Sequence, residues 1–142
     1  MIQGDKELLL KDICARLPYG VKINENIQGD FTLLGLTNER VFTTCEVEGC
    51  HNDFPIELIK PYLFPLSSLT EEQRNYISKL LIDTQNEFPP YGELNAKGCD
   101  NLFVCSVKQA NVLINYCLAN HLDINGLIEK GLAIDATGLD IY

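Results

Sequence analysis

Apolar residues recur at helical spacing near the start of the chain. Leu9, Ile13 and Leu17 follow one another at steps of four residues, which places them on one face of a helix. We expect Asp5 to cap the start of this helix, because its carboxylate can accept hydrogen bonds from the first free backbone N–H groups. Pro18 predicts the end of the helix, since the residue before a proline avoids helical geometry.

A second helix is predicted over residues 71–85. Thr70 and Gln73 have the spacing of a capping box, in which each side chain accepts a hydrogen bond from the backbone N–H of the other residue. An apolar face with a 3.6-residue period follows, made by Tyr76, Ile77, Leu80 and Leu81. Capping and periodicity agree here, so the pattern favours a helix strongly.

A third helix is predicted over residues 107–119. Ser106 and Gln109 repeat the capping-box spacing at its start. The face that we expect to be buried comprises Val107, Ala110, Leu113, Ile114, Cys117 and Leu118. We expect Asn120 to end this helix in a left-handed conformation.

The segment between the first and second helices has β character. Residues 21–23, 31–36 and 40–47 are rich in β-branched and apolar side chains, and residues 37–39 between the last two are short enough for a hairpin. Residues 26–30 and 48–52 each contain one glycine and are predicted to be turns. The pattern predicts a small antiparallel sheet of three to four strands, covered on one face by helices.

Three prolines shape residues 53–68. Pro55, Pro61 and Pro65 exclude a long helix and a central strand, because proline lacks the N–H that both structures use. One helical turn over residues 55–60 is compatible with them. Residues 61–66 are then expected to run extended, either across the core or as an exposed recognition segment for a partner.

The remaining segments carry turn signals. Residues 86–101 contain two consecutive prolines and two glycines and predict a long loop whose role the sequence leaves open. Asp123 is expected to cap a short helix that Gly131 closes, and residues 132–134 to form a last short strand. The whole chain, residues 1–142, is therefore predicted to be one α+β domain in which the sheet packs against three to four helices. The N-terminal helix and the helices at 71–85 and 107–119 are expected to supply most of its core.

Charge and hydropathy narrow the function classes. The chain has 20 acidic and 11 basic residues and a net charge of −9, which argues against nucleic-acid binding because phosphate recognition needs clustered Lys and Arg. An acidic mimic of DNA that binds a basic protein is one alternative. No signal peptide or membrane-spanning run is visible, so we expect the cytoplasm, with the six cysteines as reduced thiols and no membrane partner.

Three blocks of sequence resemble a known family. They comprise residues 17–22, residues 60–63 with 65–72, and residues 120–121 with 126–133, and they span most of the chain in the same order as in the family. The chain is similar through them to a family of small uncharacterised proteins of gut bacteria, often associated with prophages or other mobile elements. The resemblance implies a cytoplasmic accessory protein and transfers no activity, cofactor or site residue.

Cysteine and histidine residues offer two candidate constellations. Cys45 and Cys50, with His51 adjacent, could supply half of a zinc site if Cys99 and Cys105 met them in space, which spacing alone does not decide. The second constellation pairs Cys117 with His121 one helical turn later, as a nucleophile and its base, with Asp123 close enough in sequence to orient the ring.

The interpretation favoured by the sequence is a small, acidic, non-enzymatic protein that acts by binding another protein. Neither a cofactor, a metal ion nor a catalytic residue is expected, and the oligomeric state stays open. The candidate interaction surface comprises Tyr62, Phe64, His121 and Asp123. The alternative is a small metal-binding protein or enzyme that uses its Cys and His residues.

Overall fold

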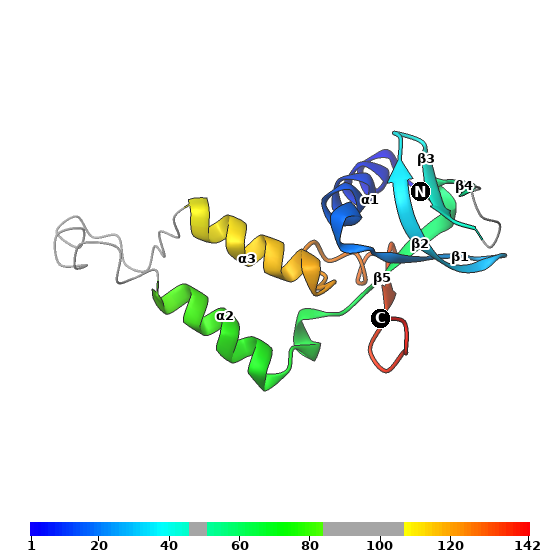
Figure 1. Cartoon of the computed structure of the whole chain (residues 1–142). Helices are drawn as coiled ribbons and strands as arrows, with labels where there is room; N and C mark the ends of the chain where they lie inside the picture. Colours follow the sequence, from blue (N-terminus) through cyan, green and yellow to red (C-terminus); the bar gives the residue numbers. More distant parts are fainter. Residues whose placement is uncertain (46–50, 84–106) are drawn as a thin grey trace. The chain divides into compact units, whose positions relative to one another are not determined.

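A computed structural model describes residues 1–45, 51–83 and 107–142 of the chain (Figure 1). The chain divides into two compact units, which are described separately. Unit 1 comprises residues 1–68 and 117–142, and unit 2 comprises residues 69–116. Whether these units form the single domain predicted for residues 1–142 stays a prediction.

Unit 1 is built on a mixed sheet of six strands among the described residues, in the order β4-β3-β2-β1-β5-β6. The strands are β1 (Lys22–Glu25), β2 (Gly29–Leu36), β3 (Arg40–Thr44), β4 (His51–Pro55), β5 (Ile59–Leu63) and β6 (Ile134–Asp135). Neighbours from β4 to β5 are antiparallel, whereas β5 and β6 are parallel. The α+β class is confirmed, but the sheet is larger than the three to four antiparallel strands predicted.

The additional strands come from segments with weak β signals. β4 begins at His51, within the turn predicted over residues 48–52, because its register against β3 pairs Thr44 with His51. The hairpin between β2 and β3 is confirmed: Thr37 donates its N–H to the Arg40 carbonyl, and its hydroxyl accepts the Arg40 N–H. The far end of the predicted strand 40–47 extends beyond the described residues.

Pro61 lies inside β5, which has neighbours on both sides, so excluding a central strand was wrong. β1 lies beside β5 over residues 59–61, with Ile23 opposite Pro61. β6 pairs only with Tyr62 and Leu63. At Pro61, β5 is therefore paired with β1 but not with β6. On the β6 side no hydrogen bond is needed at this position, so the missing N–H of proline has no cost there.

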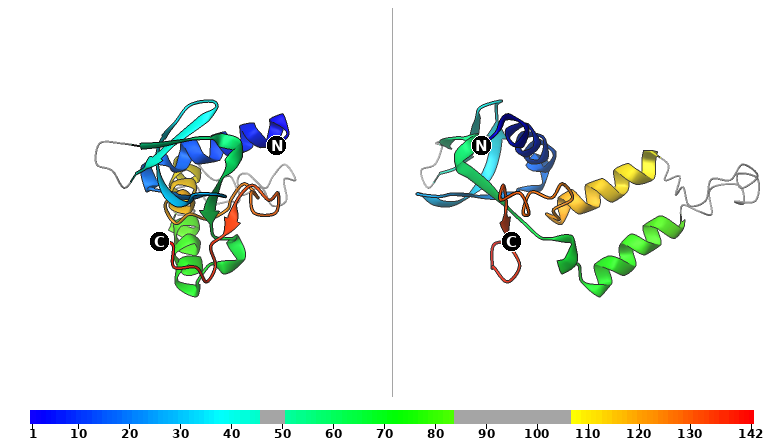
Figure 2. Two further views of the ribbon diagram at one scale, coloured as in Figure 1. Left: turned by 90° about the vertical axis from the view of Figure 1, so that its right-hand side faces the viewer. Right: turned by 180° about the vertical axis from the view of Figure 1, so that it is seen from behind.

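The N-terminal helix α1 (Gln3–Arg16) covers one face of the strands (Figures 1 and 2). It starts two residues before the predicted cap, because the carbonyl of Ile2 accepts the N–H groups of Asp5 and Lys6. Asp5 instead lies in the first turn, where its charge suits the positive end of the helix dipole. Pro18 follows the helix in the short 3₁₀ turn η1 (Leu17–Tyr19), which Gly20 closes at φ +65°.

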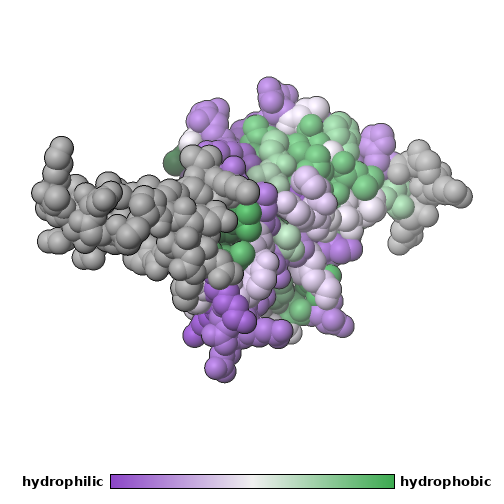
Figure 3. Space-filling model, turned by 60° about the vertical axis from the view of Figure 1, so that its left-hand side comes forward, coloured by the Kyte–Doolittle hydropathy of each residue, from purple (hydrophilic) through white to green (hydrophobic). Residues whose placement is uncertain are grey.

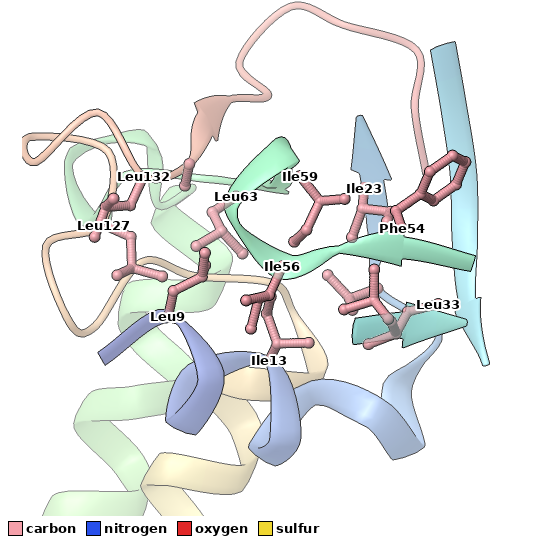
Figure 4. Packing of buried hydrophobic residues seen from close by; sticks show 13 residues of the cluster. Leu9, Ile13, Ile23, Leu33, Phe54, Ile56, Ile59, Leu63, Leu127 and Leu132 are labelled. Atoms are coloured by element: carbon pink, nitrogen blue, oxygen red, sulfur yellow. The ribbon is translucent and has the colours of Figure 1, made fainter. Parts of the chain in front are cut away.

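The core of unit 1 lies between α1, the sheet and a segment near the end of the chain (Figure 4). Leu9 and Ile13 of α1 meet side chains of the strands and of the 3₁₀ turn η2 (Ile56–Leu58). Leu127, Leu132 and Ala133 complete the cluster. The helices at 71–85 and 107–119 contribute less to the core than expected. Cys117 and Leu118, predicted to lie on the buried face of the second of these helices, are buried, but no described residue of either helix belongs to this cluster.

Two α-helices follow the 3₁₀ turn η3 (Leu66–Ser68) in the sequence. They are α2 (Glu71–Asp83) and α3 (Val107–Ala119). The capping box of α2 is confirmed: the Gln73 N–H donates to the Thr70 hydroxyl at 3.2 Å, and the Thr70 N–H donates to the Gln73 side-chain oxygen at 3.0 Å. Ser106 and the predicted loop 86–101 lie outside the described residues.

The end of α3 differs from the prediction by one residue. His121, rather than Asn120, takes the left-handed conformation, with φ +54°. Asp123 does cap the next segment, since its carboxylate accepts the N–H groups of Leu127 and Ile128. That segment is a series of turns and not a helix, and Gly131 closes it at φ +69°.

Candidate functional site

The structure brings together the four residues of the predicted interaction surface, all in unit 1. Phe64 donates its N–H to the carbonyl of His121 at 2.9 Å, and Asp123 donates its N–H to the carbonyl of Phe64 at 2.8 Å. These bonds form an isolated parallel bridge between Phe64 and Leu122, two residues after Tyr62. Tyr62, His121 and Asp123 are buried and Phe64 is half-buried, so this cluster offers little accessible surface to a partner.

Tyr142, which the sequence analysis did not single out, contacts three of these four residues. Its ring stacks on His121 and lies at 5.9 Å from the ring of Phe64. Its hydroxyl donates to the carbonyl of Tyr62 at 2.8 Å and accepts the N–H of Lys22 at 3.1 Å. Tyr142 as a whole is 46% exposed, but partial burial of its hydroxyl raises the pKa of this residue to about 12.

His121 is held in an unusual state. Burial, together with the nearby positive charge of Arg16, lowers the pKa of His121 to about 4. Its Nδ1 atom is buried and has no hydrogen-bond partner among the described residues. The imidazole is therefore neutral at physiological pH and too weak a base to activate a nucleophile well.

A buried ion pair, also missed from the sequence, lies beside this cluster. Arg16 donates from Nε to Asp12 Oδ2 at 2.6 Å and from Nη2 to Asp12 Oδ1 at 3.1 Å, and both side chains are completely buried. Arg16 Nη2 also donates to the carbonyl of Leu122 at 2.8 Å, and Asn125 donates to Asp12 Oδ1 at 2.7 Å. The pair thus ties α1 to the segment that follows α3. Its i, i+4 spacing on the same stripe as Leu9 and Ile13 was the available sequence signal.

The candidate nucleophile Cys117 is buried, and burial raises the pKa of its thiol. A buried thiol that stays protonated is unreactive, because the thiolate is the nucleophile and the metal ligand. Cys14 is exposed and Cys45 half-buried, both as free thiols. Cys50, Cys99 and Cys105 lie outside the described residues, so the predicted zinc constellation stays a hypothesis.

The described residues offer few features for small-molecule chemistry. Within residues 1–45, 51–83 and 107–142, no group of three or more His, Cys, Asp or Glu side chains is placed to hold a metal ion. A shallow hollow, open to solvent, lies at the β2–β3 turn and is lined by Thr37, Asn38, Glu39 and Arg40. His51 lies exposed on β4 with its ring edge-on to Phe42.

Unit 2 has the opposite character, because its described apolar side chains are half-buried or exposed. Among residues 69–80 and 110–116, for which burial is described, none is buried. Tyr76 of α2 is 48% exposed, and Val112 and Ile114 of α3 are each 44% exposed. The exposure of Ile114 differs from the prediction, which placed it on the buried face of this helix. Figure 3 shows one face of the molecule coloured by hydropathy, on which hydrophobic residues gather beside hydrophilic ones.

The two helices of unit 2 meet through aromatic side chains. The rings of Tyr76 and Tyr116 lie 4.8 Å apart at an angle of 32°. Val112 precedes Tyr116 by one helical turn, so it lies on the same side of α3. We call Tyr76, Val112 and Tyr116 the tyrosine face. It combines apolar area with hydroxyl groups, as protein-binding surfaces commonly do.

Comparisons with known proteins add no relative. No protein-family model matches the chain, and no curated protein and no solved structure matches it. In the part of the chain that the structure describes, no helix has both the length and the apolar character required to cross a membrane.

Proposed function

We propose that this protein acts by binding another protein, and that the tyrosine face of α2 and α3 is its contact surface. The observation that carries the proposal is the exposure of apolar side chains on the two helices. In the parts of α2 and α3 that belong to unit 2, no residue whose burial is described is buried. Helices of this length are stabilised in proteins mainly by packing of an apolar face. A partner that covers the tyrosine face would supply that packing.

The side chains of the tyrosine face suit such a contact. Tyrosine is enriched among the residues that contribute most to protein–protein affinity, because its ring buries a large area and loses little conformational entropy. Charged residues are depleted at the centre of interfaces, and none belongs to this face. The predicted surface of Tyr62, Phe64, His121 and Asp123 is less suitable, since three of those residues are buried.

The state of the histidine and cysteine side chains in unit 1 also favours binding over catalysis. His121 is neutral, buried and stacked, and Cys117 is buried with a raised pKa. The alternative of a Cys/His enzyme or metal-binding protein gains no support from these two residues. A cytoplasmic accessory role, associated with prophages or mobile elements, belongs to the same proposal. It rests on the sequence resemblance and on the free thiols of Cys14, Cys45 and Cys117.

Affinity capture with matched variants tests the proposal. The full chain, its Tyr76→Glu variant and its Ser78→Glu variant would be immobilised and exposed to lysate of the native host, with bound proteins quantified by mass spectrometry. Ser78 is exposed on the side of α2 away from Tyr76, so it controls for the added charge. We expect the wild type and Ser78→Glu to retain the same protein and Tyr76→Glu to lose it. Equal recovery on all three would contradict the tyrosine face as the contact surface.

A further inference from the structure

We propose that the protein bound by the tyrosine face is a second copy of this chain, docked about a two-fold axis beside Tyr76. The inference rests on the proposed function and names its partner. In this arrangement α2 of one copy lies antiparallel to α2 of the other. The order of charges along α2 and the distribution of charge over the whole chain favour this arrangement.

One stripe of α2 carries an acidic, an aromatic and a basic residue in turn. Glu72, Tyr76 and Lys79 are spaced at i, i+4 and i+7, so they lie on the same side of the helix. All three are exposed. With Tyr76 in the middle, the stripe has opposite charges at its two ends.

Such a stripe is complementary to itself when it is turned by 180°. A two-fold contact pairs each residue with the symmetry-related surface, so an antiparallel α2 pair places Glu72 of one copy opposite Lys79 of the other, twice. The two Tyr76 rings then lie side by side at the axis. A parallel pair would instead oppose Glu72 to Glu72 and Lys79 to Lys79, which is repulsive.

Net charge favours these helices as the place where two copies meet. The chain as a whole carries −9, so two copies repel one another over most surfaces. In α2 the charges are Glu71, Glu72, Arg74, Lys79 and Asp83, and Lys108 is the one charged residue of α3. These charges cancel, so the pair of helices is neutral and the excess acidity lies elsewhere in the sequence.

Residues of α3 in the same chain extend the proposed contact beyond α2. Tyr116 lies against Tyr76, and Val112, 44% exposed, lies one turn further along the same side of α3. An α2–α2 contact therefore has apolar area beside it from both copies. Tyrosine and valine at the centre with a charge pair at each end is the usual division between the core and the rim of an interface.

Sedimentation equilibrium of the purified full chain tests the inference directly, over about 1 to 200 µM protein. We expect a concentration-dependent dimer for the wild type and for Ser78→Glu. Tyr76→Glu should weaken dimerisation by at least about thirtyfold, the loss typical of a central interface residue. Circular dichroism of each variant shows whether it folds.

Charge reversal provides a test that loss of folding cannot imitate. Glu72→Lys and Lys79→Glu should each weaken their own dimer by about tenfold, because like charges then face each other twice. Mixed together, the two variants should form a heterodimer at wild-type affinity, since every pair is again of opposite sign. The double variant Glu72→Lys/Lys79→Glu should also recover the dimer.

The outcomes separate this inference from the proposed function. A wild-type chain that stays monomeric at the highest concentration overturns the second copy as the partner, while capture of another protein that depends on Tyr76 would still support protein binding. A dimer that survives Tyr76→Glu, or a mixture of the two charge variants that forms no heterodimer, overturns the two-fold contact through α2.

Discussion

The imidazole of His121 lies almost flat on the phenol ring of Tyr142, with ring centroids 3.9 Å apart and planes inclined by 13°. The two residues belong to different segments of unit 1, one directly after α3 and the other after β6. The Tyr142 ring also lies 5.9 Å from the ring of Phe64, whose backbone forms the bridge to Leu122. His121 is buried in this arrangement, away from water.

This burial predicts that the protein loses stability in weak acid. His121 keeps its neutral form in the folded protein down to a pKa of about 4, whereas in the unfolded chain it binds a proton near pH 6.5. The unfolded state therefore binds more protons between these values, and stability falls as pH falls through them. We expect a loss of about 3 kcal/mol between pH 7.5 and pH 4, relative to a chain without this histidine. Urea denaturation at several pH values, followed by far-UV circular dichroism, measures it.

His121→Asn is the matched control for this measurement. Asparagine tolerates the left-handed backbone conformation and does not titrate in this range. Tyr142, which stacks on the imidazole, does not titrate in this range, because its pKa is about 12. If wild type and His121→Asn showed the same slope of stability against pH, the buried neutral state of His121 would be wrong.

Removal of the Tyr142 hydroxyl should cost about 1 to 2 kcal/mol of stability. In Tyr142→Phe the N–H of Lys22 and the carbonyl of Tyr62 lose their partner, but the stack on His121 stays. Tyr142→Leu should cost more, because the ring contacts with His121 and Phe64 are lost as well. Thermal unfolding of both variants provides the comparison, and equal melting temperatures for Tyr142→Phe and wild type would contradict the hydrogen bonds.

Replacing one partner of the buried ion pair should destabilise unit 1 far more than replacing both partners with apolar residues. Asp12→Asn leaves the Arg16 charge buried without its counter-charge, at a cost of about 3 to 5 kcal/mol. In the double variant Asp12→Leu/Arg16→Met no charge remains buried, so we expect less than half of that loss. Because the chain has no tryptophan, circular dichroism is the suitable signal for urea unfolding. A double variant less stable than Asp12→Asn would show that the pair stabilises by more than mutual neutralisation.

The thiols of Cys14 and Cys117 should differ strongly in reactivity. Cys14 is exposed on α1, whereas Cys117 is buried with a raised pKa. We expect iodoacetamide at pH 8 to label Cys14 rapidly and Cys117 only after denaturation, because the thiolate is the reacting form. Peptide mass spectrometry over time resolves the two sites. Rapid labelling of Cys117 in the native protein would revive the hypothesis of a reactive cysteine.

The elements predicted well are those with a local cause. The capping box at Thr70 and Gln73 fixes the start of α2 through two hydrogen bonds between residues three apart. The β2–β3 hairpin is likewise fixed by contacts within residues 37–40. For such elements, hydropathy period and capping chemistry contain most of the information.

The features that escaped prediction depend on residues far apart in the chain. The burial of Asp12 and Arg16 contradicts the rule that charges face water. It is explained by their mutual pairing and by the distant Leu122 carbonyl and Asn125 amide that bond to them. Tyr142 acquires its role from Lys22 and Tyr62, which no local pattern connects to it. Pro61 could enter β5 because β6, from the end of the chain, begins to pair one residue later.

The bridge between Phe64 and Leu122 has a consequence for how this chain can vary. Because the backbone of Phe64 is hydrogen-bonded to His121 and Asp123, on either side of Leu122, the ends of the segment between Phe64 and Leu122 are held side by side. The entropy of closing a loop rises only slowly with its length, so residues between these ends could lengthen, shorten or be exchanged at modest cost to the rest of the fold. Unit 2 can thus be regarded as an insertion in unit 1, whose sequence and length can change while α1 and the sheet keep their structure.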